Sequence, residues 1–135
     1  SDIANVRQWV DKSDSDEYAL NSDFKAVPKN TIVYEIFGAL FFGATKDLLN
    51  IVNEEGKNVL IFRMRNVPIM DISGLEALEE LLGICKKRNM TLILSHVNEQ
   101  PIKVMEKAGF IEKAGRENFC ENIDKALERA RTLDK

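Results

Sequence analysis

The sequence is poor in the residues that build metal and disulfide sites. It contains two cysteines, Cys85 and Cys120, and a single histidine, His96. Because there is no CxxC pair and no second histidine, a zinc site made of Cys and His ligands is excluded. Two isolated thiols are typical of a protein from a reducing compartment. A chain of 135 residues is long enough to bury a sufficient core in one domain, so it needs neither disulfides nor a structural metal to fold.

The sequence also lacks long apolar runs and an excess of positive charge. Its longest nearly apolar stretch, 36–44, is about half as long as a transmembrane helix, so we expect no membrane insertion of this chain. Lys and Arg number 19 against 22 Asp and Glu, a net charge of −3, which argues against nucleic-acid binding. The chain starts at Ser1 without Met, basic region or cleavage site. We therefore expect no targeting segment and interpret the chain as a piece of a longer protein.

The first part of the chain differs from the rest. Apolar residues follow helical spacing at Ile3, Val6, Trp9 and Val10. A polar, acidic run without apolar members then occupies 11–17. This pattern predicts a short amphipathic helix and a linker over residues 1–23, followed by one globular domain over residues 24–135.

Short strands and amphipathic helices alternate in the globular part. The patterns predict strands at 31–37, 40–42, 59–62 and 91–94, and helices at 45–55, 74–89, 101–108 and from about 117 to 130. The run Val59–Phe62 is apolar without alternation. It therefore predicts a central strand that is covered on both faces. We predict an α/β fold with a mixed, mostly parallel sheet of four to five strands and four helices.

The two catalytic patterns in the sequence are incomplete. Gly38–Thr45 has the glycine spacing of a phosphate-binding loop, but Ala44 stands where the essential Lys should be. Asp71, Ser73 and His96 are the residue types of a catalytic triad. However, the segment around Ser73 lacks the leading Gly of a nucleophile elbow. We therefore expect no catalytic residues and no enzymatic activity.

The segment around Ser73 has two possible roles, and the sequence does not decide between them. Ser73 and Glu76 form a Ser-x-x-Glu capping box, which predicts that Ser73 caps the helix beginning at Gly74. A hydroxyl at a helix N-terminus also lies in positive potential, where a phosphate or another anion is stabilised. Asp71, Ser73 and Gly74 are thus a candidate phosphorylation or anion site.

Two arginines near the end of the central strand form a second candidate site. Arg63 and Arg65 alternate with Met64 and therefore share one face of the strand. We expect a structural ion pair, with Asp71 as the partner. Anion recognition by the two arginines is the alternative.

Several of these segments resemble one known family. Asp71–Leu75 is similar to the Asp-Ser-Ser-Gly-Leu signature of the STAS domain of anti-sigma-factor antagonists, in which the second Ser is phosphorylated. Three further stretches resemble the STAS domain of SulP anion transporters, namely 32–44, 60–68 with its Arg-Met-Arg-Asn-Val-Pro sequence, and 108–127. The resemblance covers roughly residues 28–131.

The resemblance implies a cytosolic, non-catalytic domain that regulates and assembles a SulP-type sulfate or inorganic anion transporter. It places the domain at the cytoplasmic face of the inner (plasma) membrane, with residues 1–23 linking it to the last membrane helix. The implied partners are the transmembrane domain of the same polypeptide, and a regulatory protein or a second copy. The only implied ligand is a weakly bound nucleotide. The transporter pattern usually has Thr where this chain has Ser73. A free anti-sigma-factor antagonist switched by phosphorylation of Ser73 therefore stays the alternative.

Overall fold

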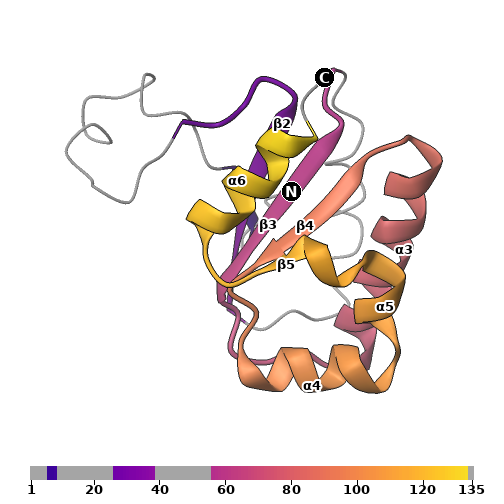
Figure 1. Ribbon diagram of the computed structural model, residues 1–135. Helices are drawn as coiled ribbons and strands as arrows, with labels where there is room; N and C mark the ends of the chain where they lie inside the picture. The colour runs from indigo at the N-terminus through magenta and orange to yellow at the C-terminus, as the bar shows by residue number, and fades with distance from the viewer. Residues whose placement is uncertain (1–5, 9–25, 39–55, 134–135) are drawn as a thin grey trace.

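The computed structural model describes residues 6–8, 26–38 and 56–133. Its strands are β1 (Val6–Gln8), β2 (Thr31–Phe37), β3 (Val59–Asn66), β4 (Thr91–Ser95) and β5 (Phe119–Cys120). Its helices are α3 (Ile72–Lys87), α4 (Glu99–Lys107), α5 (Phe110–Ala114), the 3₁₀ turn η3 (Arg116–Asn118) and α6 (Ile123–Thr132). The strands lie in one sheet in the order β1-β2-β3-β4-β5, and Figure 1 shows β2 to β5 side by side. β1 is antiparallel to β2, and all other neighbours are parallel.

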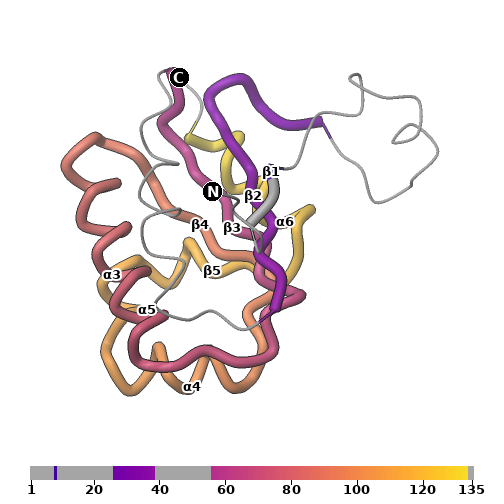
Figure 2. The backbone as a smooth tube through the Cα atoms, turned by 180° about the vertical axis from the view of Figure 1, so that it is seen from behind, coloured from indigo at the N-terminus to yellow at the C-terminus, as the bar shows by residue number. Residues whose placement is uncertain are grey.

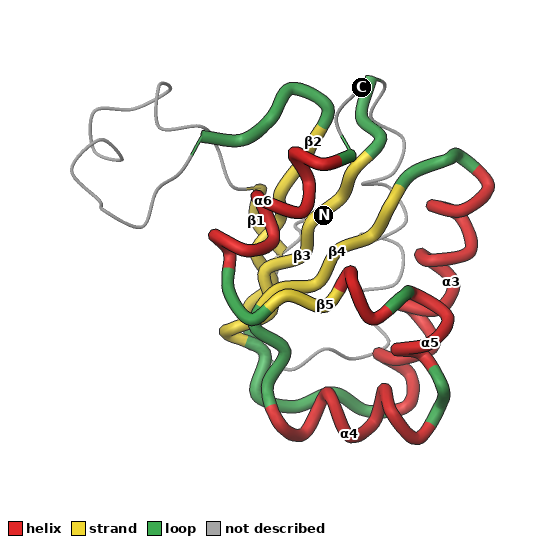
Figure 3. The backbone as a smooth tube through the Cα atoms, in the orientation of Figure 1, coloured by secondary structure: helices red, strands yellow, loops and turns green. Residues whose placement is uncertain are grey.

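Helices cover both faces of the sheet. α3, α4 and α5 bury their apolar side chains against one face, where Leu60 and Phe62 of β3 lie. α6 packs on the other face, against Val59 and Ile61 of the same strand. Figure 3 shows the two groups of helices on opposite sides of the strands. Because successive side chains of a strand point to opposite faces, β3 supplies both halves of the core.

The predicted fold class is confirmed. β3 is the third of the five strands, and its residues from Val59 to Met64 are buried. This agrees with the central position predicted from the unbroken apolar run. The sheet is mixed and mostly parallel, and four α-helices lie within the described ranges. No helix in the described residues has the length and apolar character needed to cross a bilayer.

The predicted N-terminal helix is wrong at Val6–Gln8. These residues form β1, which pairs with β2 from Val6 opposite Ile36 to Gln8 opposite Tyr34. Figure 2 shows β1 beside β2. The free edge of β2 offers backbone donors and acceptors that helical spacing does not reveal, and such tertiary pairing overrides local pattern.

The predicted last helix begins too early. Residues from Glu117 belong to η3 and β5, and α6 begins only at Ile123. The side chain of Asn122 caps α6 by accepting a hydrogen bond from the Lys125 amide at 2.8 Å. Phe119 lies in β5 instead of on the helix, and its ring meets that of Phe110 edge-on at 6.2 Å. The helical spacing of Phe119 therefore arose by coincidence.

Other predictions lie outside the described residues. These are the strand at 40–42, the helix at 45–55, the loop 38–45 beyond Gly38, and the linker that follows β1. α5 is an addition that the sequence patterns did not indicate. It is separated from α4 by Ala108 and Gly109, and the φ of 73° at Gly109 is a left-handed conformation that glycine adopts without strain.

Candidate functional site

The parallel strands bring charged residues together where they end. β2, β3 and β4 pair in register, so that Thr31, Val59 and Thr91 lie side by side at their starts. The fifth residues of the three strands, Glu35, Arg63 and Ser95, consequently form one row across the sheet. The row falls on the face that α6 covers, since residues alternate between faces and Ile61 packs against that helix. All three residues are buried.

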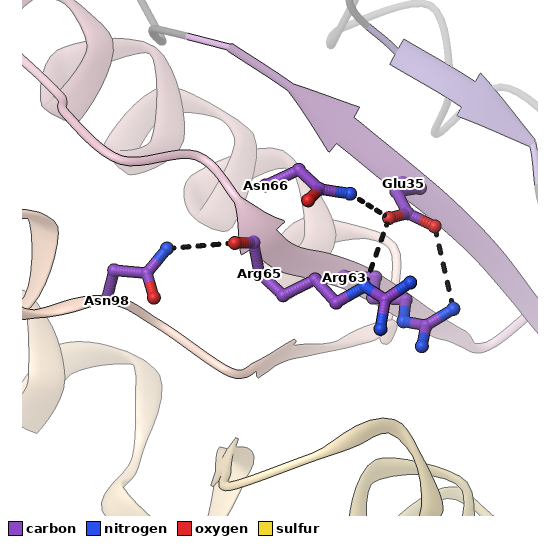
Figure 4. Close-up of polar contacts among 5 residues, drawn as sticks. All are labelled: Glu35, Arg63, Arg65, Asn66 and Asn98. Carbon is purple, nitrogen blue, oxygen red and sulfur yellow. Dashed lines mark hydrogen bonds and ion pairs between the residues drawn. The ribbon is translucent and has the colours of Figure 1, made fainter. Parts of the chain in front are cut away.

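Glu35 is the centre of a polar network. Its Oε1 atom lies 3.6 Å from Nη1 of Arg63, and its Oε2 atom lies 3.7 Å from Nε of Arg65. Asn66 donates a hydrogen bond from its side-chain amide to the same Oε2 at 2.6 Å. Figure 4 shows the three side chains converging on the carboxylate. A buried carboxylate with two guanidinium groups and an amide is well compensated for its loss of hydration.

A β-bulge allows three polar side chains of one strand to contact the same carboxylate. Glu35 lies opposite Arg63, but Phe37 lies opposite Asn66, so β3 has one residue more than β2 in this interval. An extra residue bends the strand and changes the direction of the side chains that follow. Arg65 and Asn66 can therefore both reach Glu35, although they are neighbours in the chain.

The two arginines form ion pairs, but not with the predicted partner. Both guanidinium groups bind Glu35 rather than Asp71. Sequence proximity suggested Asp71, whereas the carboxylate that Arg63 meets comes from the neighbouring strand. The pairing of β2 and β3 decides the partner, because it places Glu35 directly beside Arg63.

The predicted capping box at Ser73 is also wrong. α3 begins at Ile72, and its N-cap is Asp71, whose Oδ1 accepts a hydrogen bond from the Gly74 amide at 2.8 Å. Asp is a strong N-cap residue because its carboxylate both accepts this bond and complements the helix dipole. Ser73 therefore lies within the first turn of α3, where its side chain is partly exposed. Gly74 is buried.

The loop between β3 and α3 is held by side chains from the start of α4. The Asn98 amide donates to the carbonyls of Arg65 and Val67 at 3.0 and 2.9 Å. Gln100 accepts from the Met70 amide at 2.8 Å and donates to the Met70 carbonyl at 3.0 Å. Four hydrogen bonds thus fix the loop that leads to Asp71 and Ser73.

The remaining candidate residues do not assemble into a catalytic site. No hydrogen bond among the described residues joins any two of Asp71, Ser73 and His96. His96 is exposed and has a φ of 56°, and its backbone amide donates to the Cys120 carbonyl. The part of the chain that the structure describes holds no group of three or more His, Cys, Asp or Glu suited to a metal.

The two thiols are poor nucleophiles. Burial raises the pKa of Cys85 to about 11 and also raises the pKa of Cys120, although Arg88 and Arg129 respectively oppose the change. Both cysteines are unpaired. At neutral pH they therefore carry their protons, and only the thiolate attacks an electrophile.

Sequence reasoning missed Glu35, Ser95, Asn98 and Gln100. For Glu35 a signal existed, because it is a lone charge in the apolar run Thr31–Phe37 and stands as far from its strand start as Arg63 does. The buried Ser95 hydroxyl has no hydrogen-bond partner among the residues that the structure describes, and it adds a polar atom to the same row. For Asn98 and Gln100 no signal existed, since their partners are backbone atoms about 30 residues away.

We predict that Asp71→Ala destabilises the domain and that Ser73→Ala does not. Asp71→Ala removes the capping oxygen and should lower the free energy of unfolding by about 1 kcal/mol. Ser73→Ala is the matched control and should change it by less than about 0.5 kcal/mol. Urea unfolding followed by circular dichroism measures both values. A larger loss in Ser73→Ala than in Asp71→Ala contradicts the cap assignment.

We also predict that the charge of Glu35 is needed for stability. Glu35→Ala leaves the buried Arg63 guanidinium without its carboxylate and should cost about 3 kcal/mol of unfolding free energy. Glu35→Gln keeps an oxygen acceptor and should cost about 1.5 kcal/mol, the share of a charge-assisted hydrogen bond. Equal, small losses in both variants in urea unfolding would show that the network contributes little.

The fold and parts of the sequence are similar to known transporter domains. A structure of a sulfate transporter family protein from Wolinella succinogenes superposes with a TM-score of 0.77 and 39% identity, over 83% of this chain and 93% of that one. The STAS domain of a SulP transporter from Vibrio cholerae gives a TM-score of 0.71 and 29% identity, over 82% and 88% of the two chains. SLC26A9 and the anti-sigma factor antagonist SpoIIAA, at 15% and 18% identity with TM-scores of 0.74 and 0.57, share the fold.

Sequence comparison agrees with the structural one. The chain is 31% identical to the putative sulfate transporter YvdB of Bacillus subtilis over 96 residues. These aligned residues make up 68% of this chain and 18% of that relative. The chain thus spans about a fifth of the length of this relative. The family model of the STAS domain matches residues 25–126. A match over most of the chain, on a fold shared with solved STAS domains, shows that the chain belongs to the STAS domain family.

Proposed function

We propose that the chain is the cytosolic regulatory and assembly domain of a SulP-type transporter for sulfate or another inorganic anion. The similarity to the SulP transporter STAS domain of Vibrio cholerae, over 82% of this chain and 88% of that one, carries the proposal. The 31% identity to YvdB supports it. In this proposal, residues 1–23 link the domain to the membrane part of the same polypeptide and also contribute β1 to its sheet, and residues 24–135 form the rest of the domain.

The proposed role is non-catalytic. Asp71 is engaged as a helix cap and His96 is not hydrogen-bonded to it, so the residue types of a triad are not arranged as one. Both thiols have a raised pKa. Instead, the polar groups at the strand ends stabilise a rigid edge of the domain. Such an edge suits a module that transmits contacts between proteins.

We predict that the complete polypeptide is found in the membrane fraction and takes up radiolabelled sulfate in cells. Replacing Glu35 by Ala in that polypeptide should lower sulfate uptake, because the domain unfolds more readily. Ser73→Ala should leave the amount of the polypeptide in the membrane unchanged. Membrane fractionation, immunoblotting and uptake assays measure these effects. A complete polypeptide that stays in the soluble fraction contradicts the proposal.

A free anti-sigma-factor antagonist is the second candidate. The observation that favours it is the place of Ser73 in the first turn of α3, partly exposed and not engaged as the cap. A phosphate there would be attracted by the helix dipole and repelled by the carboxylates of Asp71 and Glu76. The attraction acts at the nearest amides, so we expect the folded state to survive such a modification.

We predict that Ser73→Asp changes a protein contact without unfolding the domain. Its melting temperature should stay within about 4 °C of the unmodified chain, because a change of about 1 kcal/mol shifts a domain of this size by no more than that. If the chain is part of a transporter, sulfate uptake by the complete polypeptide should change, and if it is a free antagonist, its binding to an anti-sigma factor should change. Ser73→Ala should leave both unaltered. Unaltered uptake and partner binding in Ser73→Asp remove the regulatory role of this residue.

A further inference from the structure

Positive charge gathers at the edge of the sheet where the parallel strands begin. A cation and an asparagine come shortly before each of these strands, as Lys29-Asn30 before β2, Lys57-Asn58 before β3 and Arg88-Asn89 before β4. The ends of α3 and α6 lie at the same edge, in the upper part of Figure 1, and they add further cations. We use the name basic edge for six residues, namely Lys29, Lys57, Lys86, Lys87, Arg88 and Arg131.

Contacts between neighbouring segments hold the basic edge together. The Lys57 ammonium donates a hydrogen bond to the Lys29 carbonyl at 2.8 Å. The first amide of β4 donates to the Asn58 carbonyl at 2.9 Å, so the loops before β2, β3 and β4 are neighbours. Arg131 lines a hollow together with Ala26, which places the end of α6 beside the segment that leads to Lys29.

The charge of the basic edge contrasts with that of the rest of the chain. The described segments that form it, 26–30, 56–58, 86–90 and 131–133, contain no Asp or Glu. The other residues of the chain comprise 13 cations and 22 carboxylates, a net charge of −9. By sequence, the adjoining residues outside the described ranges add two cations and three carboxylates, so the charge of the edge stays positive: Lys25, Glu54, Glu55, Asp134 and Lys135.

Helix dipoles explain only part of this cluster. Lys86 and Lys87 complement the negative end of α3, and Arg131 complements that of α6. Lys29 and Lys57 precede strands, where no such dipole exists. Neither forms an ion pair with a carboxylate of the described residues, so their like charges repel each other. A cluster that costs stability and does not serve a helix indicates a contact surface.

We propose that the basic edge binds an Asp- and Glu-rich segment of a cytosolic protein. The long lysine side chains extend into solvent, where the carboxylates of a partner reach them without approaching the backbone. Complementary charge increases the rate of encounter and suppresses binding of wrong partners. This inference adds to the proposed function a surface for a soluble partner.

Two features of the basic edge disfavour other anionic ligands. α3 and α6 end there, so their last carbonyls disfavour a compact anion such as phosphate that must approach the backbone. Single-stranded nucleic acids stack on aromatic side chains, and the described segments of the basic edge contain none. An acidic protein segment needs neither backbone amides nor aromatic rings.

The path of the chain disfavours the membrane surface as the ligand. β1 pairs with β2 from Val6 opposite Ile36 to Gln8 opposite Tyr34, so it runs toward the basic edge, and Figure 2 shows it beside β2. In the proposed function the membrane part precedes the domain, so the chain enters at the opposite edge and the basic edge faces the cytosol. Only this step of the inference depends on the proposed function.

The test measures how a fluorescein-labelled polyglutamate peptide binds the chain, by fluorescence anisotropy. Lys29→Glu combined with Lys87→Glu reverses two exposed charges of the basic edge. Lys103→Glu combined with Lys125→Glu is the matched control, because both residues are exposed cations outside the basic edge and the net charge changes equally. Circular dichroism shows whether each variant keeps the fold.

We expect the basic-edge variant to bind the peptide at least about tenfold more weakly than the unmodified chain, and the control variant to stay within about twofold. Raising the salt concentration from about 50 to about 200 mM should weaken binding to the unmodified chain, because exposed charges make the contact. A polyglutamine peptide of the same length should not bind.

Two results would show that there is no specific site for acidic segments. The first is that the unmodified chain does not bind the polyglutamate peptide. The second is equal weakening in the basic-edge and control variants, which indicates unspecific attraction. Either result overturns the inference.

Three further results would identify another occupant and also overturn it. Displacement of the peptide by inorganic phosphate at constant ionic strength indicates a compact anion. Tighter binding to phosphatidylglycerol vesicles, lost in the basic-edge variant, indicates a membrane. Binding that appears only after the acidic residues of 11–17 are replaced by their amides indicates that the chain itself occupies the edge. Because all these measurements use the chain in solution, they leave the proposed function to the membrane fractionation and uptake assays above.

Discussion

The in-register pairing of β2 and β3 is the constraint on which the polar network around Glu35 depends. It aligns Glu35 with Arg63, so a carboxylate and a guanidinium that are both buried neutralise each other. A slip of one residue would turn Glu35 to the other face, among the apolar side chains beneath α3. The unpaired charge would then be far more costly than the lost hydrogen bonds of the ladder. Charge and hydrophobic alternation thus select the same register.

Arg65 connects the polar network at the strand ends to the loop before α3. Its guanidinium lies beside Glu35, and its carbonyl accepts a hydrogen bond from Asn98 at the start of α4. Three elements therefore meet at one residue, as Figure 4 shows. We expect a substitution that disrupts the Glu35 network also to affect the backbone at Met70. Arg65 of this network and Met70 lie at the two ends of the same loop, which is held there by hydrogen bonds.

Local pattern predicted the central elements well, because their signals lie within a few residues. The apolar run from Val59 identified a central strand, and the leucine spacing from Leu75 identified α3. Which residue caps a helix and which segments pair as strands was not predictable in the same way. Ser73 with Glu76 matched a capping box, yet Asp71 caps α3, since two residues only two positions apart both suit a cap and only the start of the helix decides between them. The strand at Val6–Gln8 depends on the free edge of β2, which no nearby residue reveals.

Within the described residues, the two outer strands of the sheet are short. β1 has three residues and β5 has two. An edge strand with many unpaired backbone groups can recruit a strand of another molecule and start aggregation, and shortness is one of the ways proteins avoid this. Held beside many identical copies at high local concentration, the described sheet offers little template for strand exchange. The arrangement therefore lets contacts between copies, or with a larger assembly, be made by side chains rather than by backbone.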